Sequence, residues 1–411
     1  MVSHPIQSLK TDPITVIGIG EDGYDGLSPI ARTVLAKASV IFGGKRHLAL
    51  LPDEIGGEKR AWISPFEDNL PLIAAMRDQG PVVLASGDPM FFGVGNTLID
   101  YFGSGSISVI PHPSSISLLC ARLGRALVDC DVITLHGRPL AGLVARLRPR
   151  GQIIALSHDG ETVRHVASLL TDRGYGNSPI TVCERLGGAA EKITSHPATQ
   201  WMDDKTAIDP LNILMIDLVA RPEAQIWGQT GGLPDDAFIH DGMITKSHVR
   251  AISLASLSPW QGAVLWDLGA GCGSVAIEWM RAGGDAFAIE RDASRCAMMR
   301  QNADLLGVPG LTILQGDIAD SLPDLPTPDA IFVGGGITTP DLMRACWNRL
   351  PPHGRLVANA VTLQGDRELL SFQNEFGGTL SRLQVSHIVA RGGFDGWHSL
   401  APVTHYLGLK S

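Results

Sequence analysis

An apolar run followed by alternating glycines, residues 264–274, constrains the fold more than any other part of the sequence. Its first five residues, Val-Leu-Trp-Asp-Leu, predict a buried parallel strand. Gly269, Gly271 and Gly273 follow, and a helix is expected directly after them. Glycine lets the backbone turn tightly and approach a ligand where a Cβ atom would collide. The pattern predicts a doubly wound α/β sheet with a ligand at the carboxyl end of this strand.

The next predicted strands also end in acidic residues or glycine. Residues 286–290 end in Glu290, residues 311–315 are followed by Gly-Asp317, and residues 330–333 are followed by three glycines. In nucleotide sites, a carboxylate at the end of the second strand accepts hydrogen bonds from ribose hydroxyls. Because the carboxyl ends of parallel strands share one crevice, these four strand ends predict a site for a nucleotide-type cofactor.

The spacing within the glycine loop favours S-adenosylmethionine over NAD. A dinucleotide-binding loop follows the pattern G-x-G-x-x-G, whereas here Ser274 and Val275 come directly after Gly273. The sulfonium cofactor has no pyrophosphate that such a loop would have to hold. Asp267, just before the loop, suits the ammonium group of this cofactor, and it suits equally well a role in bracing the amides of the loop.

The chain length and a break in the pattern indicate two domains. The chain has 411 residues, whereas a single domain usually has roughly 100–200. Residues 14–219 alternate strands and helices, which predicts a second α/β domain. Prolines and glycines then displace any periodic pattern in residues 221–234, which we interpret as a linker. The expected domains are therefore residues 1–220 and 235–411.

The composition excludes several classes of protein. Apolar residues make up 44% of the chain, too many for intrinsic disorder, and the net charge of −9 argues against a nucleic-acid binder. No apolar run reaches the roughly 18 residues of a membrane span, and Met1–Lys10 lacks the pattern of an export signal. We therefore expect a cytoplasmic protein with no membrane partner. The six cysteines are too scattered to predict a metal site or a disulfide framework.

Longer strings in the second half are similar to the decarboxylating precorrin methyltransferases of corrin (cobalamin) biosynthesis. They are Gly-Met-Ile-Thr-Lys at 242–246, residues 266–279, Ala-Ile-Glu-Arg at 288–291, Phe-Val-Gly-Gly-Gly at 332–336 and residues 354–362. The resemblance implies a Rossmann-like class I methyltransferase fold that binds S-adenosylmethionine. It places the cofactor contacts at Thr245, Gly269, Ala270, Gly271, Cys272, Gly273, Glu290, Asp317 and Ile318.

The first half resembles the tetrapyrrole methylase family. The matching strings are Ile-Gly-Ile-Gly at 17–20, Leu-Ala-Ser-Gly-Asp-Pro at 84–89 and Ile-Pro-His-Pro-Ser-Ser-Ile at 110–116. The resemblance implies a two-lobed class III methylase fold. Glu21 stands where the family usually has proline, which leaves open whether the first loop contacts the cofactor. The implied contacts of this second S-adenosylmethionine site are Ser86, Gly87, Asp88, Phe91, Ser114 and Ser115.

Together the two resemblances cover nearly the whole chain, in the order found in fused methyltransferases of cobalamin biosynthesis. They imply that the N-terminal half methylates C5 of the tetrapyrrole precorrin-6B. They further imply that the C-terminal half methylates C15 and removes the carboxyl group of the C12 acetate, which gives precorrin-8. One cofactor site per domain and a homo-oligomer are also implied. Two alternatives stay open, namely methylation of another macrocycle and a half that serves only as a non-catalytic scaffold.

The implied chemistry calls for basic side chains more than for a nucleophile. Methyl transfer to a nucleophilic macrocycle carbon needs alignment and exclusion of water. A polycarboxylate substrate, in contrast, needs cationic anchors. For Arg250 and Arg295, which lie on predicted helices, the alternative is a solvated side chain. The candidate anchors are Lys246, His248, Arg250, Arg295 and Arg391, with His387 and His398 as possible proton carriers.

Overall fold

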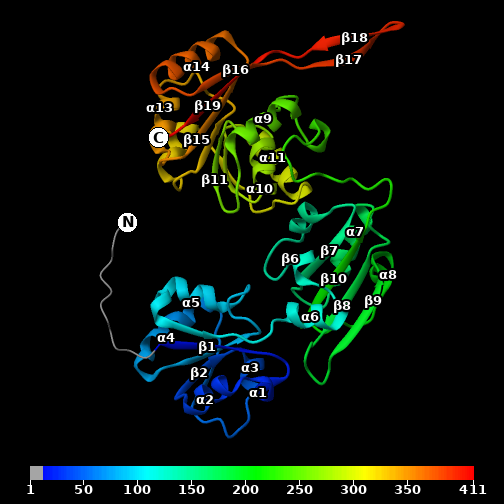
Figure 1. The fold of residues 1–411 in the computed structure, drawn as a ribbon, viewed down its shortest axis with the longest axis vertical. Coiled ribbons are helices and arrows are strands. Elements are labelled where there is room, and N and C mark those ends of the chain that lie inside the picture. The colour runs from blue at the N-terminus through cyan, green and yellow to red at the C-terminus, as the bar shows by residue number, and fades with distance from the viewer. Residues whose placement is uncertain (1–12) are drawn as a thin grey trace. The chain divides into compact units, whose positions relative to one another are not determined.

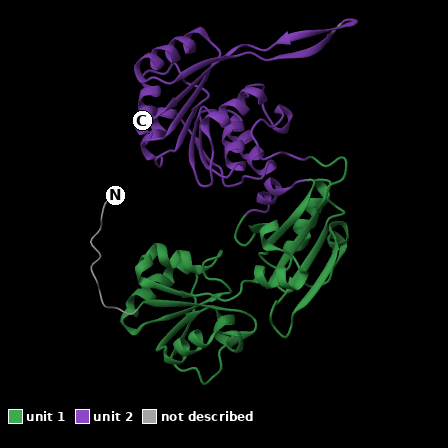
Figure 2. Cartoon of the chain, viewed as in Figure 1, with its two compact units in different colours: residues 1–138, 149–225 green, residues 139–148, 226–411 purple. Residues whose placement is uncertain are grey.

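The computed structural model describes residues 13–411, apart from the side chain of Arg391, and divides them into two compact units (Figure 2). The segment Met1–Lys10, for which we expect no export signal, lies outside the described residues. Unit 1 comprises the described residues up to Arg138 together with Pro149–Gln225, and unit 2 comprises Pro139–Arg148 together with Ile226–Ser411. The boundary after Gln225 falls within the segment that we interpret as a linker.

The first sheet of unit 1 is parallel and has the strand order β3-β2-β4-β1-β5 (Figure 1). Its interior strand β1 is buried on both faces, because Ile14 and Val16 pack into one core cluster and Ile17 and Ile19 into another. This explains why the sequence of β1 is a continuous apolar run. The strands are β1 (Ile14–Ile19), β2 (Val40–Gly43), β3 (Glu58–Ala61), β4 (Val82–Ser86) and β5 (Ile107–Ile110), and the helices are α1 (Gly23–Gly26), α2 (Pro29–Lys37), α3 (Lys45–Ala49), α4 (Asn69–Ala75) and α5 (Val94–Phe102).

The second sheet of unit 1 is mixed and has the order β6-β7-β10-β8-β9. β10 pairs antiparallel with both β7 and β8, whereas β6 and β7 are parallel. Two sheets within one unit confirm the expected two-lobed architecture. The strands are β6 (Cys130–Thr134), β7 (Arg150–Leu156), β8 (Pro179–Glu184), β9 (Lys192–Pro197) and β10 (Asn212–Val219), and the helices are α6 (Ser115–Leu123), α7 (Thr162–Asp172) and α8 (Ala198–Asp203).

Unit 2 contains a seven-stranded sheet with the order β13-β12-β11-β14-β15-β19-β16. The strands from β13 to β15 in this order are parallel, and β19 runs antiparallel to both of its neighbours. The chain proceeds outward from β11 through β12 to β13 and then returns to β14, so the strand order reverses between β11 and β14. Ligands bind at such a switch point in doubly wound sheets. The strands are β11 (Val264–Leu268), β12 (Asp285–Glu290), β13 (Thr312–Gln315), β14 (Ala330–Val333), β15 (Arg355–Ala360), β16 (Thr379–Leu383) and β19 (Val403–Leu409).

Helices cover both faces of this sheet, which confirms the doubly wound prediction. α9, α10 and α11 contribute buried residues to one core cluster, and α13 and α14 contribute to the other. The helices are α9 (Ser247–Leu257), α10 (Ser274–Arg281), α11 (Ala293–Leu305), α12 (Ile318–Ser321), α13 (Leu342–Arg349) and α14 (Leu363–Phe376). Short 3-10 helices lie at Phe66–Asp68, Arg77–Gln79, Ser104–Ser106, Leu127–Asp129, Leu140–Arg146, Asp235–Ala237 and Leu322–Asp324.

Helix α9 begins at Ser247, where Asp235 from an earlier segment accepts the backbone N–H at 2.9 Å and so caps the helix. The C-terminal strands were not predicted. Among them, β17 (Ser386–Arg391) and β18 (Phe394–Ser399) form a separate hairpin that extends away from the seven-stranded sheet (Figure 1).

The helices of residues 13–411 include none that combines the length and apolar character needed to cross a membrane. All six cysteines are free, and only Cys130 is not fully buried. The part of the chain that the structure describes contains no group of three or more His, Cys, Asp or Glu side chains arranged to hold a metal ion.

Candidate functional site

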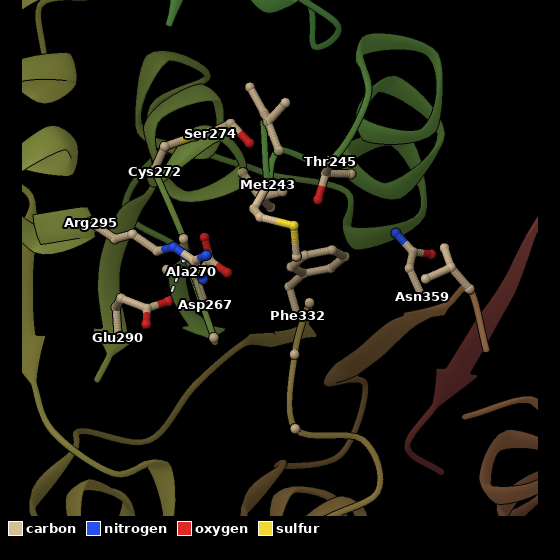
Figure 3. A pocket seen from close by; sticks show the side chains of 18 of the residues that line it. Met243, Thr245, Asp267, Ala270, Cys272, Ser274, Glu290, Arg295, Phe332 and Asn359 are labelled. Carbon is tan, nitrogen blue, oxygen red and sulfur yellow. Dashed lines mark hydrogen bonds between the residues drawn. The ribbon is translucent and has the colours of Figure 1, made fainter. Parts of the chain in front are cut away.

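A cavity of about 730 Å³ lies in unit 2 at the carboxyl ends of β11, β12, β14 and β15 (Figure 3). It includes the switch point of the sheet, between β11 and β14. The loops after these two strands touch, since a Cβ atom at Gly269 would lie only 2.9 Å from the Gly335 Cα. Of the expected cofactor residues, those lining the cavity are Thr245, Gly269, Ala270, Gly271, Cys272, Glu290, Asp317 and Ile318.

The glycine loop leaves its central position open toward the cavity. Gly271 has a φ of +57°, and the atom nearest to a Cβ at this position would be the Met243 carbonyl oxygen, at 3.3 Å. Gly273, which we also expected to contact the cofactor, lies outside the lining residues. A Cβ there would lie 2.4 Å from the Met299 Cγ. Gly273 is therefore required for close packing where α10 begins, rather than for the wall of the cavity.

Glu290 and Asp317 supply carboxylates at two neighbouring strand ends. The Glu290 side chain is buried, and its two oxygens accept the N–H groups of Gly271 at 2.9 Å and Asp292 at 3.0 Å. A carboxylate has about four acceptor positions, so Glu290 can still accept bonds from ligand hydroxyls. Asp317 accepts the Ala319 N–H at 3.1 Å and caps α12.

Asp267 braces the segment that follows the glycine loop with one carboxyl oxygen and keeps the other unpartnered. One oxygen, Oδ2, accepts the Ala276 N–H at 3.0 Å and so braces α10. The other, Oδ1, is buried and has no partner among the described residues, although Asp267 lines the cavity. Burial raises the pKa of this carboxyl from 3.8 to about 7, and the Glu290 charge adds to the rise. An unpartnered buried carboxylate oxygen beside a cavity suits a cationic ligand group.

Arg250 is neither a solvated side chain nor a substrate anchor, contrary to both expectations. It is fully buried, and its Nε donates to Glu278 Oε1 at 2.6 Å. Its other nitrogens donate to the carbonyl oxygens of Thr245 and Leu233. Arginine is seldom buried unless it is paired, and Glu278 supplies that pair. Through the Thr245 carbonyl, Arg250 holds the backbone of a segment that lines the cavity.

Arg250→Lys should therefore loosen this segment. Lysine keeps the charge but cannot reproduce the planar fork that reaches three acceptors at once. We expect a loss of about 1–3 kcal/mol in unfolding free energy, because buried acceptors are left unpaired. Urea denaturation would measure it. The matched control is Arg344→Lys, in an exposed pair with Glu375, where a change below about 0.5 kcal/mol is expected. Equal losses in the two variants would contradict this role.

The remaining basic candidates fall into two groups. Lys246 and Arg295 line the cavity, and they pair with Asp235 at 3.5 Å and Asp241 at 2.9 Å. His248 lies outside the lining residues, and its ring stands 5.4 Å from that of His387. His387 and His398 lie on the hairpin β17–β18. The side chain of Arg391 lies outside the described residues.

Several lining residues were not predicted from the sequence. Met243 and Phe332 lie in the middle of the cavity, and Asn359 lies on the side away from Glu290 (Figure 3). Asn359 falls within the string 354–362, but nothing in that string alone indicates a role. An apolar wall beside it is formed by Val361, Leu383, Val385, Leu400, Ala401 and Val403.

In unit 1, the carboxyl end of β1 meets the loops after β4 and β5. A Cβ at Gly18 would lie 1.9 Å from the Gly87 carbonyl oxygen, and a Cβ at Gly87 would lie 2.9 Å from the Ser114 Cα. The structure therefore brings Ser86, Gly87 and Ser114 together. The Ser114 hydroxyl caps α6 by accepting the Ser117 N–H, and Ser115 is the first residue of that helix.

Asp88 and Phe91 follow in the same loop. Asp88 Oδ1 accepts the Met90 N–H at 2.9 Å, so its carboxylate braces the turn at Pro89. Phe91 is 45% exposed and packs edge-on against Phe92, with ring centroids 4.8 Å apart. An exposed aromatic ring beside the turn leaves apolar surface available for a ligand.

Glu21, which departs from the usual proline, is the centre of an ion-pair cluster. Its nearly buried carboxylate accepts from Arg46 of α3 and, at 2.9 Å, from Arg185 after β8. Arg185 also pairs with Asp209 at 2.6 Å. Glu21 thus links the lobe of the first sheet to the lobe of the second sheet, a role that no local sequence pattern indicates. Arg46 also donates to the Ser86 hydroxyl at 2.9 Å, which ties this cluster to the β4 loop.

The chain matches known families in both halves. Residues 13–200 match the model of the tetrapyrrole (corrin/porphyrin) methylases, and residues 236–410 match that of a precorrin methyltransferase domain. A precorrin-6Y C(5,15)-methyltransferase [decarboxylating] from Sinorhizobium sp is 43% identical over all of this chain and 99% of its own length. The protein of the same name from Mycobacterium tuberculosis is 40% identical over 97% of this chain and 100% of its own length.

A solved structure gives a further match. The crystal structure of the C-terminal domain of precorrin-6Y C5,15-methyltransferase from Rhodobacter capsulatus is 40% identical in sequence. The match covers 45% of this chain and 100% of that chain, with a TM-score of 0.43.

Proposed function

Because the chain belongs to the family of decarboxylating precorrin-6Y C5,15-methyltransferases, we propose that it methylates a precorrin at C5 and C15 and removes one carboxyl group. The methyl donor in this proposal is S-adenosylmethionine, and the pathway is cobalamin biosynthesis. The observation that carries the proposal beyond the family name is the cavity at the switch point of unit 2. There an acceptor for hydroxyl groups, Glu290, and an unpartnered carboxylate oxygen, Asp267 Oδ1, lie beside one glycine loop.

These residues fit the two polar ends of S-adenosylmethionine. Glu290 would accept hydrogen bonds from the ribose hydroxyls, and Asp267 would accept them from the methionine ammonium group. The open position at Gly271 would let the backbone approach the cofactor. When bound, the cofactor supplies an electrophilic methyl group. The expected contacts are completed by Thr245, Gly269, Ala270, Cys272, Asp317 and Ile318, all of which line the cavity.

We further propose one cofactor site per domain, with the second site in residues 1–220. The meeting of the β1 end with the β4 and β5 loops supports this, because all three are parallel strands whose carboxyl ends share one edge. Residues 1–220 would then methylate C5, and residues 235–411 would methylate C15 and remove the C12 acetate carboxyl. The contacts proposed for the second site are Ser86, Gly87, Asp88, Phe91, Ser114 and Ser115.

The substrate of this proposal is precorrin-6B, and the product is precorrin-8. Such a polycarboxylate needs cations at the mouth of the cavity, and Lys246 and Arg295 are the candidates because they line it. Their pairing with Asp235 and Asp241 holds both side chains in place at the cavity. His248 is a weaker candidate, because it lies outside the residues that line the cavity.

A homo-oligomer and a cytoplasmic location also stay part of the proposal. The hairpin β17–β18 supports association, since an isolated two-stranded hairpin is at best marginally stable in water. Its side chains Ile388, Phe394 and Trp397 are 62%, 84% and 70% exposed. Burying them against another copy of the chain would remove this apolar surface from water.

Incubation of the full chain with precorrin-6B and S-adenosylmethionine, followed by mass spectrometry, tests the function. We expect a product that has gained two methyl groups and lost one carboxyl group. A product with one added methyl would instead favour the alternative in which one half is a scaffold. No reaction with precorrin-6B, but turnover of a different macrocycle, would favour the other alternative.

A further inference from the structure

The half of the unit 2 cavity away from Glu290 differs in chemistry from the cofactor half. Figure 3 shows Asn359 and Glu290 on opposite sides, with Met243 and Phe332 between them. Of the described lining residues that follow α13, Asn359 alone is polar, and the others form the apolar wall defined above. Thr245 adds one hydroxyl group on the same side (Figure 3). A flat, largely apolar macrocycle would find its matching surface on this side.

Hydrogen bonds within unit 2 fix the orientation of the Asn359 amide. The Ser253 hydroxyl donates to the Val249 carbonyl at 2.8 Å, so it must accept the bond from Asn359 Nδ2, also at 2.8 Å. The amide oxygen Oδ1 therefore faces His405 Nδ1, at 2.8 Å, and this ring nitrogen must carry the proton. His405 Nε2 then accepts from the Ser256 hydroxyl at 3.0 Å.

The centre of this network is buried, and one N–H group of Asn359 has no partner within the network. Ser253 is 0% exposed and His405 4% exposed. Burial also lowers the pKa of His405, which favours the neutral form of its imidazole. The Nδ2 group carries two hydrogens, and the network uses one of them. The second has no partner among the described residues, and Asn359 borders the cavity. A neutral N–H donor is thus held rigidly beside an apolar wall.

This combination favours the removal of a carboxylate. Apolar surroundings destabilise a carboxylate relative to the neutral carbon dioxide that leaves. A cationic partner would form a strong charge-assisted bond and stabilise the carboxylate, which would oppose its loss. A neutral donor can orient the group with a weaker bond.

We propose that Asn359 binds the departing acetate carboxylate of the macrocycle, and that His405 is a positioning residue that fixes the Asn359 amide. This inference rests on the proposed function. In the step, the bond between the methylene carbon and the carboxylate carbon breaks and carbon dioxide leaves. The electron pair of that bond passes into the conjugated macrocycle, and the methylene carbon takes a proton from solvent water to become a methyl group.

The test is the ratio of carbon dioxide released to methyl groups transferred at C15, measured with precorrin-6B and the full chain. Asn359→Asp keeps the shape and the acceptor for His405, but it replaces the donor with a negatively charged oxygen. We expect the ratio to fall by about 100-fold, as for other lost donors in active sites, while C5 methylation is unchanged. Asn359→Ala, which adds no charge, should lower the ratio as well. The matched control is Asn348→Asp, an exposed position on α13, which should behave like the unchanged protein.

His405 has its own pair of variants. His405→Asn can place an amide N–H where the ring Nδ1–H stands, whereas His405→Leu cannot donate to Asn359. We expect the carbon dioxide ratio to fall in His405→Leu and to recover largely in His405→Asn. A residue needed only for packing would not give this rescue, and equal behaviour of the two variants would overturn the positioning role.

The outcomes separate this inference from the proposed function. An unchanged ratio in Asn359→Asp, or an equal loss of decarboxylation and C15 methylation, would overturn the inference alone. If the unchanged protein released no carbon dioxide from precorrin-6B, the proposed function would fail and the inference with it. Persistent C15 methylation in each variant would show that unit 2 is folded and that the loss is local.

Discussion

Gly271→Val is expected to abolish C15 methylation and decarboxylation while C5 methylation persists. The φ of Gly271 is +57°, a conformation that a β-branched residue adopts only with strain. The valine side chain would also extend into the space proposed for the cofactor, beside the Met243 carbonyl oxygen. The backbone N–H of Gly271 holds Glu290 at 2.9 Å, so any shift of the loop would displace this carboxylate too.

We expect a loss of at least about 100-fold in C15 methylation, since displacements of about 1 Å in an active site already cost that much. Mass spectrometry of the products from precorrin-6B would measure both methylations. Titration with S-adenosylhomocysteine should show two binding sites per chain in the unchanged protein and one in the variant. A single site in both proteins would contradict the proposal of one site per domain.

The control for backbone strain is Gly262→Val. Gly262 has a φ of +80°, and the space around a Cβ there is open, so the strain is similar but the cavity is untouched. Both methylations should survive in this variant. If C5 methylation also vanished in folded Gly271→Val, the division of labour between the two domains would be wrong.

The parts of the fold that were predicted well are those in which local pattern and burial agree. β11, β12 and β14 end at the residues that the sequence predicts, because glycine or acidic residues mark these ends and the apolar residues of the strands are buried. The strands near the C-terminus were missed. β19 is antiparallel to β15 and separates it from β16, an arrangement that depends on pairing between distant residues.

The predictions for the candidate site divide in the same way, into residues that local patterns reveal and residues that pair only in the folded chain. The glycine loop, Glu290 and Asp317 follow directly from strand ends, and all contribute to one cavity. Arg250 was misjudged because arginine on a helix is usually solvated, whereas its partner Glu278 lies 28 residues away in the sequence. Asn359 and His405 are 46 residues apart, so only the folded sheet reveals that they pair.

Asp267→Asn is expected to stabilise the free protein at neutral and alkaline pH. Burial raises the pKa of Asp267 from 3.8 to about 7. The folded state therefore holds a proton that the unfolded state releases, and stability falls as the pH rises from about 4 to about 7. Because one pKa unit corresponds to about 1.4 kcal/mol, the ionised Asp267 carboxyl lowers the unfolding free energy by about 4 kcal/mol above pH 7. The asparagine side chain removes this penalty. However, it places an unpaired N–H₂ group where Oδ1 stands, which costs about 1–3 kcal/mol.

The net gain should therefore be about 1–3 kcal/mol at pH 8, and near pH 4, where the burial penalty is small, it should turn into a loss of about 1–3 kcal/mol. Urea denaturation at these two pH values would measure it. The matched control is Asp329→Asn, at the other end of the same sheet, where Asp329 Oδ2 accepts the Val264 N–H at 2.8 Å. Because Asp267 is unchanged in this variant, no gain in stability is expected there at pH 8. A loss of stability in Asp267→Asn at pH 8 would contradict the burial penalty.

The same substitution should weaken cofactor binding, and its pH dependence identifies the carboxylate that binds the ammonium group. Below pH 7 the unchanged protein must release a proton from Asp267 to bind a cation, so the Kd for S-adenosylhomocysteine in unit 2 should rise about tenfold per pH unit. Above pH 7 it should be constant. In Asp267→Asn this dependence should vanish, and the Kd at pH 8 should be about 10–100-fold higher, because a hydrogen bond to a charged group is lost. A Kd that keeps its pH dependence in the variant would assign the ammonium group to a different acceptor, since Asp267 would then no longer be the group that titrates.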